Sequence, residues 1–212
     1  MLYSALDIKI SAGFEKNIPL KHDYMQTFLE HQAQFGGANR VLVAVTDGQG
    51  EIFNRAFFET LEAITHEVSF IDGVDKSQVS SLFTPNTRYT ELTEEGLSGG
   101  PVIPSGYVPN AEGFARVRQN ILAAGIVGRL VANDFSSAMV SAQLLEVDPT
   151  TQTRLDYLKV AKAYERIRQV CEFRQIPLSE LVGDGLSAEQ RQETLDRLQK
   201  IRDNCQDRNM SI

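Results

Sequence analysis

"RVLVAVTDGQGEIFNRAFFETLEAITHEVSF", residues 40–70, indicates the architecture more clearly than any other part of the chain. Residues 40–45 are nearly all apolar, which predicts a strand at the centre of a sheet. Residues 47–50, Asp-Gly-Gln-Gly, predict a turn. Asn54 is a suitable N-cap for a helix whose apolar residues recur at the spacing of a buried stripe: Phe57, Leu61, Ile64 and Val68. The stretch therefore predicts a strand followed by a helix that packs on it.

Upstream of this stretch, the sequence predicts two further elements. Residues 6–10 alternate between apolar and polar side chains, which indicates a short strand or an isolated extended arm. A helix is expected after Pro19 and before the glycines at 36–37, because five residues fall on one helical face: Met25, Phe28, Leu29, Gln32 and Phe35.

Downstream, residues 74–83 predict a second strand, which completes a strand-helix-strand unit. Asn110 predicts the N-cap of a helix with four inward side chains: Phe114, Val117, Ile121 and Ala124. Residues 130–132 and 138–147 predict a hairpin. A long helix from about 154 to 175 is expected to carry five residues inward: Tyr157, Val160, Tyr164, Ile167 and Cys171. These elements predict an α+β sandwich, with one mixed sheet and helices packed mainly on one face.

The last segment differs from the rest of the chain. Ser187 and Gln190 fit a capping box, and the helix that follows is highly charged with a thin apolar stripe: Leu195, Leu198, Ile201 and Cys205. We therefore expect two parts, an α+β domain over residues 1–176 and an amphipathic helical appendage over residues 177–212. One alternative function, an interaction module, would use this helix as its partner surface.

Composition limits the function. The chain has 212 residues, 42% of them hydrophobic and 23% charged, which is typical of globular proteins. Its net charge is −7 and its 21 Lys and Arg residues are scattered, which disfavours nucleic acid as a partner. No apolar run approaches the roughly 18 to 20 residues that span a bilayer. Cys171 and Cys205 can form at most one internal disulfide, and the sequence leaves their oxidation state open. As a free thiol, Cys171 on its apolar stripe would be a small core residue.

Residues 96–100, Gly-Leu-Ser-Gly-Gly, match the G-x-S-x-G pattern of serine hydrolases. A nucleophile elbow needs a strand before the serine and a helix directly after it, but Pro101 and Pro104 do not follow a helical period. A hydrolase of that class also places its histidine after the serine, whereas all three histidines precede Ser98: His22, His31 and His66. A turn-rich loop is the simpler interpretation, and a hydrolase that uses Ser98 is kept as an alternative.

Metal and cofactor binding are not expected. His66-Glu67 begins like the zinc motif H-E-x-x-H, but Phe70 occupies the position of the second histidine, which favours a solvated histidine on a helix. His22 and His31 would need a third ligand that the sequence does not indicate. We predict no catalytic residues.

Four segments, in this order, resemble a known family: "FEKNIPLKHDYM", "FGGANRVLVAV", "GVDKSQVSSLFTPNTRYTELTEEGLSGGPVIP" and "GRLVANDFSSAMVSAQLLEVDP". They resemble the first extracytoplasmic loop domain of bacterial transporters of the resistance-nodulation-division (RND) superfamily. Within it, they are closest in pattern to the branch of predicted exporters related to the MMPL and hopanoid transporters. The resemblance runs from about Phe14 to Gln175, and the tail departs from the pattern.

The resemblance implies a porter-type domain with a split strand-helix-strand plan, on the periplasmic face of the inner membrane. Such a domain belongs to a proton-driven exporter, so its partners would be the rest of the parent transporter and its other subunits. Because membrane helices pack about 8 to 10 Å apart, the chain near Phe14 and the chain after Gln175 are expected on one face, within about 30 Å of each other.

In this interpretation, the substrate is a hydrophobic or amphipathic small molecule or lipid. We expect it to contact the segment 82–107, where several apolar side chains have little core to fill: Phe83, Tyr89, Leu97, Val102, Ile103 and Tyr107. The alternative is that these side chains fix the loop onto the sheet.

Overall fold

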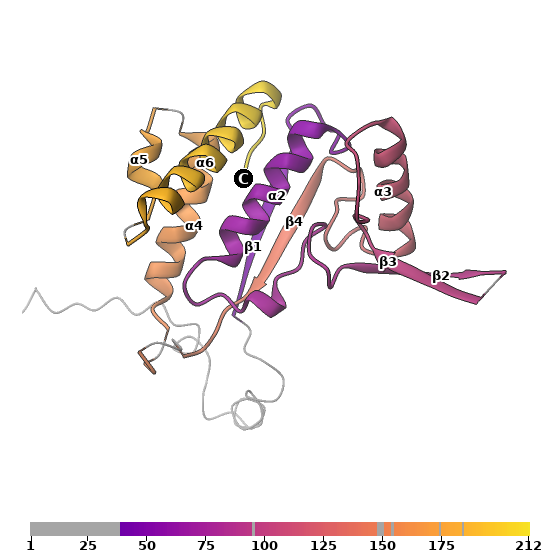
Figure 1. The fold of residues 1–212 in the computed structure, drawn as a ribbon, viewed down its shortest axis with the longest axis horizontal. Helices are drawn as coiled ribbons and strands as arrows, with labels where there is room; N and C mark the ends of the chain where they lie inside the picture. Colours follow the sequence, from indigo (N-terminus) through magenta and orange to yellow (C-terminus); the bar gives the residue numbers. More distant parts are fainter. Residues whose placement is uncertain (1–38, 95, 148–150, 154, 174, 184) are drawn as a thin grey trace, which may run out of the picture. The chain divides into compact units, whose positions relative to one another are not determined.

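Helices and two short sheets make up the part of the chain that the structure describes (Figure 1). The structure is a computed structural model that describes residues 39–94, 96–147, 151–153, 155–173, 175–183 and 185–212. The chain from Asn39 to Ile212 forms one compact unit. The predicted α+β class is confirmed. The elements expected at 6–10 and after Pro19, and the position of Phe14, lie outside the described residues.

Strand β1 (Arg40–Thr46) pairs antiparallel with β4 (Ser137–Gln143), and Val43 lies opposite Val140. The predicted strand at 40–45 is thus confirmed. Its expected place at the centre of one mixed sheet is not found among the described residues, where β1 pairs only with β4 and the other strands form a second antiparallel sheet. The apolar run is also not buried on both faces: Val43 is fully buried, whereas Leu42 is 56% exposed.

Helix α2 (Arg55–Ser69) packs against β4 and forms much of the core. The Oδ1 atom of Asn54 accepts a hydrogen bond from the backbone N–H of Phe57 at 2.8 Å, as expected of an N-cap. All four predicted stripe residues are fully buried: Phe57, Leu61, Ile64 and Val68. This helix is therefore explained by its cap and its period of apolar residues.

Residues 74–83 do not form the predicted second strand. They contain a single turn of 3-10 helix, η2 (Lys76–Gln78), and make only isolated bridges to the β4 segment. The Oδ1 atom of Asp75 accepts a hydrogen bond from the N–H of Ser77 at 3.0 Å. This local bond competes with ladder pairing and explains why an apparently strand-like run turns instead.

Strands β2 (Arg88–Thr93) and β3 (Gly96–Pro101) form a hairpin that projects away from the β1–β4 sheet (Figure 1). Helix α3 (Ala111–Ala123) contacts β2, and Asn110 caps this helix as predicted, with its Oδ1 atom 2.8 Å from the N–H of Gly113. The hairpin predicted at 130–132 and 138–147 is much shorter than expected, since those segments share only one bridge, Val131 to Ala138.

Helices α4 (Tyr157–Glu172), α5 (Leu178–Leu181) and α6 (Ala188–Arg208) form the other end of this unit. The predicted capping box of Ser187 and Gln190 is present. Tyr157 was expected to point inward but is 36% exposed. Tyr157, the first residue of α4, therefore lies outside the buried stripe, which begins at Val160.

Residues 177–212, which the sequence sets apart as an appendage, pack within the same unit. Helix α6 contacts both α2 and α4. Its stripe residues Leu198, Ile201 and Cys205 are buried. The apolar stripe, expected as the partner surface of an interaction module, therefore faces the core.

The end of the chain returns to the sheet. Thr46 and Ser211 exchange two backbone hydrogen bonds, of 2.9 and 3.1 Å. A side chain at Gly48 would meet the carbonyl oxygens of Arg208, at 2.8 Å, and Asn209. The close approach of the C-terminal segment to this turn thus requires glycine.

Candidate functional site

Four of the six predicted contact residues anchor the base of the β2–β3 hairpin to the core. Val102 is fully buried, and its carbonyl oxygen accepts a hydrogen bond from Nδ2 of Asn120 at 2.8 Å. Phe83, Ile103 and Tyr107 are partly buried against the core cluster. These positions match the alternative in which the side chains fix the segment in place.

The other two predicted residues lie on the hairpin itself. Tyr89 is on β2, opposite Gly100, and Leu97 is on β3, directly opposite Leu92. Leu97 and Leu92 are 79% and 85% exposed. The structure therefore does not gather the six residues into one cavity. Instead, the β2–β3 hairpin has two exposed leucines near its turn and is anchored to the core at its base; we call this hairpin the arm.

Ser98 lies on β3, opposite Glu91, and is exposed. The residues after it continue the strand to Pro101, so no helix starts behind the serine. The strand-turn-helix geometry of a nucleophile elbow is not present at residues 96–100. The match to G-x-S-x-G comes from a glycine-rich strand.

Tyr107 belongs to an aromatic cluster around Phe58. Its ring is stacked on that of Phe58 at a centroid distance of 5.7 Å, and Phe83 and Phe114 contact Phe58 edge-on at 6.0 and 5.3 Å. The hydroxyl of Tyr107 is buried and has no hydrogen-bond partner among the described residues. Burial raises the pKa of Tyr107 to about 12, with the charge of Arg55 acting in the opposite direction.

We expect Tyr107→Phe to raise the free energy of unfolding by about 1 kcal/mol at neutral pH, because a buried hydroxyl without a partner is costly. The pKa of Tyr107 is about 12 in the folded protein and near 10 when unfolded, so the unfolded state loses the proton first and the native protein loses stability as the pH rises from 10 to about 12. The Tyr107→Phe variant should lack this part of the decrease in the free energy of unfolding at alkaline pH. Urea unfolding across this pH range, with Tyr89→Phe as the control, measures the difference. A loss of stability at neutral pH in Tyr107→Phe would show that the hydroxyl has a partner.

Sequence reasoning missed Asp47, whose side chain is fully buried (0% exposed). Its Oδ1 atom accepts a hydrogen bond from the N–H of Gln49 at 2.8 Å. Its Oδ2 atom accepts from Nδ2 of Asn54 at 2.8 Å and from Nε of Arg208 at 2.7 Å. One carboxylate therefore joins the turn after β1, the start of α2 and the end of α6. Nothing local in the sequence distinguishes it from an ordinary turn aspartate.

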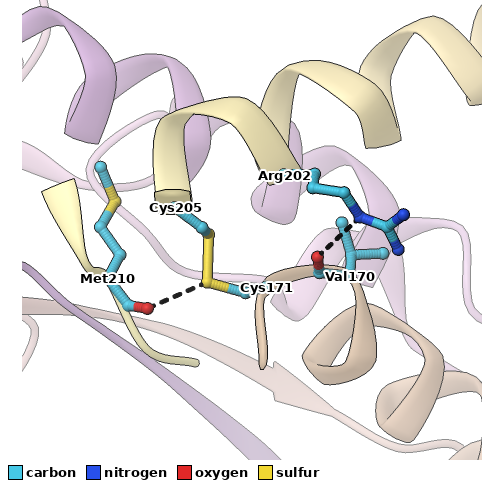
Figure 2. The surroundings of a disulfide bond; sticks show 5 residues. All are labelled: Val170, Cys171, Arg202, Cys205 and Met210. Atoms are coloured by element: carbon cyan, nitrogen blue, oxygen red, sulfur yellow. Dashed lines mark hydrogen bonds between the residues drawn. A yellow bond between two sulfur atoms is a disulfide. The ribbon is translucent and has the colours of Figure 1, made fainter. Parts of the chain in front are cut away.

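Cys171 and Cys205 form a disulfide that ties α4 to α6, with their Cα atoms 5.5 Å apart (Figure 2). This finding decides the oxidation state that the sequence left open, and it corrects the interpretation of Cys171 as a free core thiol. The bond is buried, and Sγ of Cys171 lies 3.2 Å from the carbonyl oxygen of Met210. Beside it, Nε of Arg202 donates to the carbonyl of Val170 at 3.3 Å, near the C-terminal end of α4, where a cation is favourable.

A cavity of about 590 Å³ lies between α2, α4, α5 and α6. Its apolar side includes Ile71, Ile167 and Leu198. At its rim, Nε of Arg197 binds Glu67 at 2.8 Å and Nη1 binds Glu193 at 2.9 Å. Arg197 thus forms an ion pair with each glutamate, so the two carboxylates at the rim already have a cationic partner.

His66 is 42% exposed at its side chain and stacks on Phe70 at 4.5 Å, as expected of a histidine on a solvated helix face. Within the described residues, no group of three or more potential ligands could hold a metal ion. His22 and His31 lie outside the described residues.

Comparisons with protein-family models, with curated proteins and with solved structures give no match to this chain. In the part of the chain that the structure describes, no helix is both long and apolar enough to cross a bilayer.

Proposed function

We propose that this chain is an extracytoplasmic, substrate-handling domain of a proton-driven RND-type exporter for hydrophobic or lipid-like substrates, without chemistry of its own. The Cys171–Cys205 disulfide is the observation that supports this proposal best. Disulfides persist in oxidising compartments such as the bacterial periplasm and are rare in the cytosol. The bond therefore favours the same compartment as the resemblance of the four sequence segments, and it does so independently of them.

The β2–β3 hairpin is the part of the domain that we assign to substrate handling. Leu92 and Leu97 place two apolar side chains in solvent near the end of the arm, where no core is available to cover them. The base of the arm is fixed by buried Val102 and its hydrogen bond from Asn120. An arm with an anchored base and an apolar end suits transient contact with an amphipathic molecule.

The proposal is tested by titrating the protein with a lysophospholipid below its critical micelle concentration and following the backbone amide NMR signals. We expect saturable shifts for residues of β2 and β3, and loss of these shifts in the double variant Leu92→Ser, Leu97→Ser. Leu122→Ser removes another exposed leucine, 58% exposed on α3, and should leave the shifts intact.

Two results would contradict this role of the hairpin. One is equal binding by the double variant. The other is a titration in which the hairpin signals do not move while those around the cavity between α2, α4, α5 and α6 do.

A further inference from the structure

The two faces of the arm differ in their chemistry. Residues directly opposite each other in an antiparallel pair share a face, and successive residues of a strand alternate between the two faces. Leu92 and Leu97, which are directly opposite, therefore lie on the same face as the neighbouring pair Thr90 and Gly99. Glu91 lies on the other face. The apolar side chains near the turn of the arm are thus on one side only, which we call the leucine face.

Gly99 leaves part of the leucine face without side chains. A Cβ atom at this position would lie 2.6 Å from the backbone carbonyl oxygen of Tyr89, closer than real Cβ contacts come. Only glycine therefore fits here without a shift of the backbone. Between Leu97 and Pro101, β3 places no side chain on the leucine face. An alkyl chain that covers the two leucines can extend along this bare stretch of backbone.

The charges of the arm are separated along its length. Its described residues carry three charges, and all three are exposed: Arg88 at the base, Glu91 in the middle of β2 and Glu94 in the turn. None of these side chains has a hydrogen-bond or ion-pair partner among the described residues. The two carboxylates flank Leu92 in sequence, whereas Arg88 lies four residues, or about 13 Å, toward the base. The end that carries the leucines is therefore anionic.

We propose that the leucine face of the arm binds an amphiphile with a cationic head group. This names the substrate class of the exporter function proposed above, on which the inference rests. The tail covers Leu92 and Leu97 and extends past Gly99, and the head group lies at the turn, near Glu94. Glu91, on the other face, adds to the negative potential there, because it lies within a Debye length of about 10 Å.

The position of Arg88 fixes the orientation of this amphiphile, because it repels a cationic head group from the base of the arm. An amphiphile of the opposite charge can pair only with Arg88. It is also repelled by the net charge of the chain, which is −7. Charge complementarity therefore favours the cation.

The test uses the full chain and two amphiphiles with the same alkyl chain, dodecyltrimethylammonium and dodecyl sulfate, each below its critical micelle concentration. The backbone amide NMR signals of β2 and β3 report binding to the arm. We expect dodecyltrimethylammonium to bind about fivefold more tightly, which is the range of an exposed charge interaction. Tetramethylammonium has the head group without the tail and should not move these signals.

Two double variants with the same net charge separate the arm from the rest of the chain. Glu91→Gln with Glu94→Gln should abolish the preference for the cation. Glu62→Gln with Asp207→Asn removes two exposed carboxylates outside the arm and should retain it. The inference is overturned if the first variant keeps the preference, or if both variants lose it equally, because the charge of the whole chain would then be responsible. Equal or tighter binding of dodecyl sulfate by the native arm, or a response to tetramethylammonium alone, would also overturn it.

Failure of the proposed function gives a different result. In that case neither amphiphile moves the signals of the arm, or the double variant Leu92→Ser, Leu97→Ser binds as tightly as the native chain. Equal binding of the two amphiphiles that still requires the leucines would leave substrate handling by the arm in place and remove only the selectivity for a cationic head group.

Discussion

Replacement of Cys171 and Cys205 by alanine together is expected to lower the free energy of unfolding by about 3 to 4 kcal/mol. The two cysteines are 34 residues apart, so the disulfide closes a loop of intermediate length in the unfolded chain and restricts its entropy. The bond also holds α6 against α4 beside the C-terminal segment that pairs with Thr46. Guanidinium unfolding of the oxidised protein and of the variant measures the loss.

Reduction of the native protein with dithiothreitol is the matched control, because it breaks the bond and keeps both sulfur atoms in the core. We expect reduction to account for most of the loss in the double variant. A difference below about 1 kcal/mol between oxidised and reduced protein would contradict the role assigned to the cross-link.

Asp47→Ala is expected to lower the free energy of unfolding by about 3 kcal/mol, because removing one partner leaves the other charge uncompensated. Arg208, whose side chain is only 20% exposed, would lose its carboxylate partner. The side-chain amide of Asn54 and the N–H of Gln49 would lose the same acceptor. Chemical denaturation measures the loss.

Glu59→Gln gives the matched comparison. It removes an ion pair of 3.2 Å with Lys200, whose side chain is 55% exposed, and should change stability by less than about 1 kcal/mol. Equal losses in the two variants would show that the buried carboxylate of Asp47 contributes no more to stability than an exposed ion pair does. A much larger loss in Asp47→Ala would identify it as the residue that joins β1, α2 and α6.

The sequence predicted those elements whose signals are local. Asn54, Asn110 and Ser187 each cap the helix that was expected to follow, since a cap needs only a side-chain oxygen and the next turn of backbone. The stripe of α2 was predicted in full for the same reason. The strand at 40–45 was also found, because its apolar run is continuous.

Strand pairing could not be predicted in the same way. Whether residues 74–83 join a ladder depends on what lies beside them, and there Asp75 turns the chain instead. Similarly, an apolar run such as residues 40–45 does not reveal how many neighbours the strand will have.

The candidate site depends on contacts that are distant in sequence. Of the six predicted contact residues, Val102 is buried and Tyr107 packs against the core, whereas Leu97 is exposed on β3, a division that depends on where the hairpin ends and the chain returns to the core. Asp47 and Arg208 are 161 residues apart, and no pattern in either segment indicates their pairing. The cysteines were noticed, but their pairing required α4 and α6 to be placed side by side.

The location of this domain in the cell is the central claim, and one labelling experiment tests it most directly. Ser98→Cys, on the exposed strand β3, is introduced into the gene product that contains this chain, and spheroplasts are treated with a membrane-impermeant maleimide. The buried disulfide keeps Cys171 and Cys205 from reacting. We predict that the protein sediments with the membrane and is labelled before the membrane is disrupted. Labelling only after disruption, or recovery of the protein in the soluble fraction, would contradict the account.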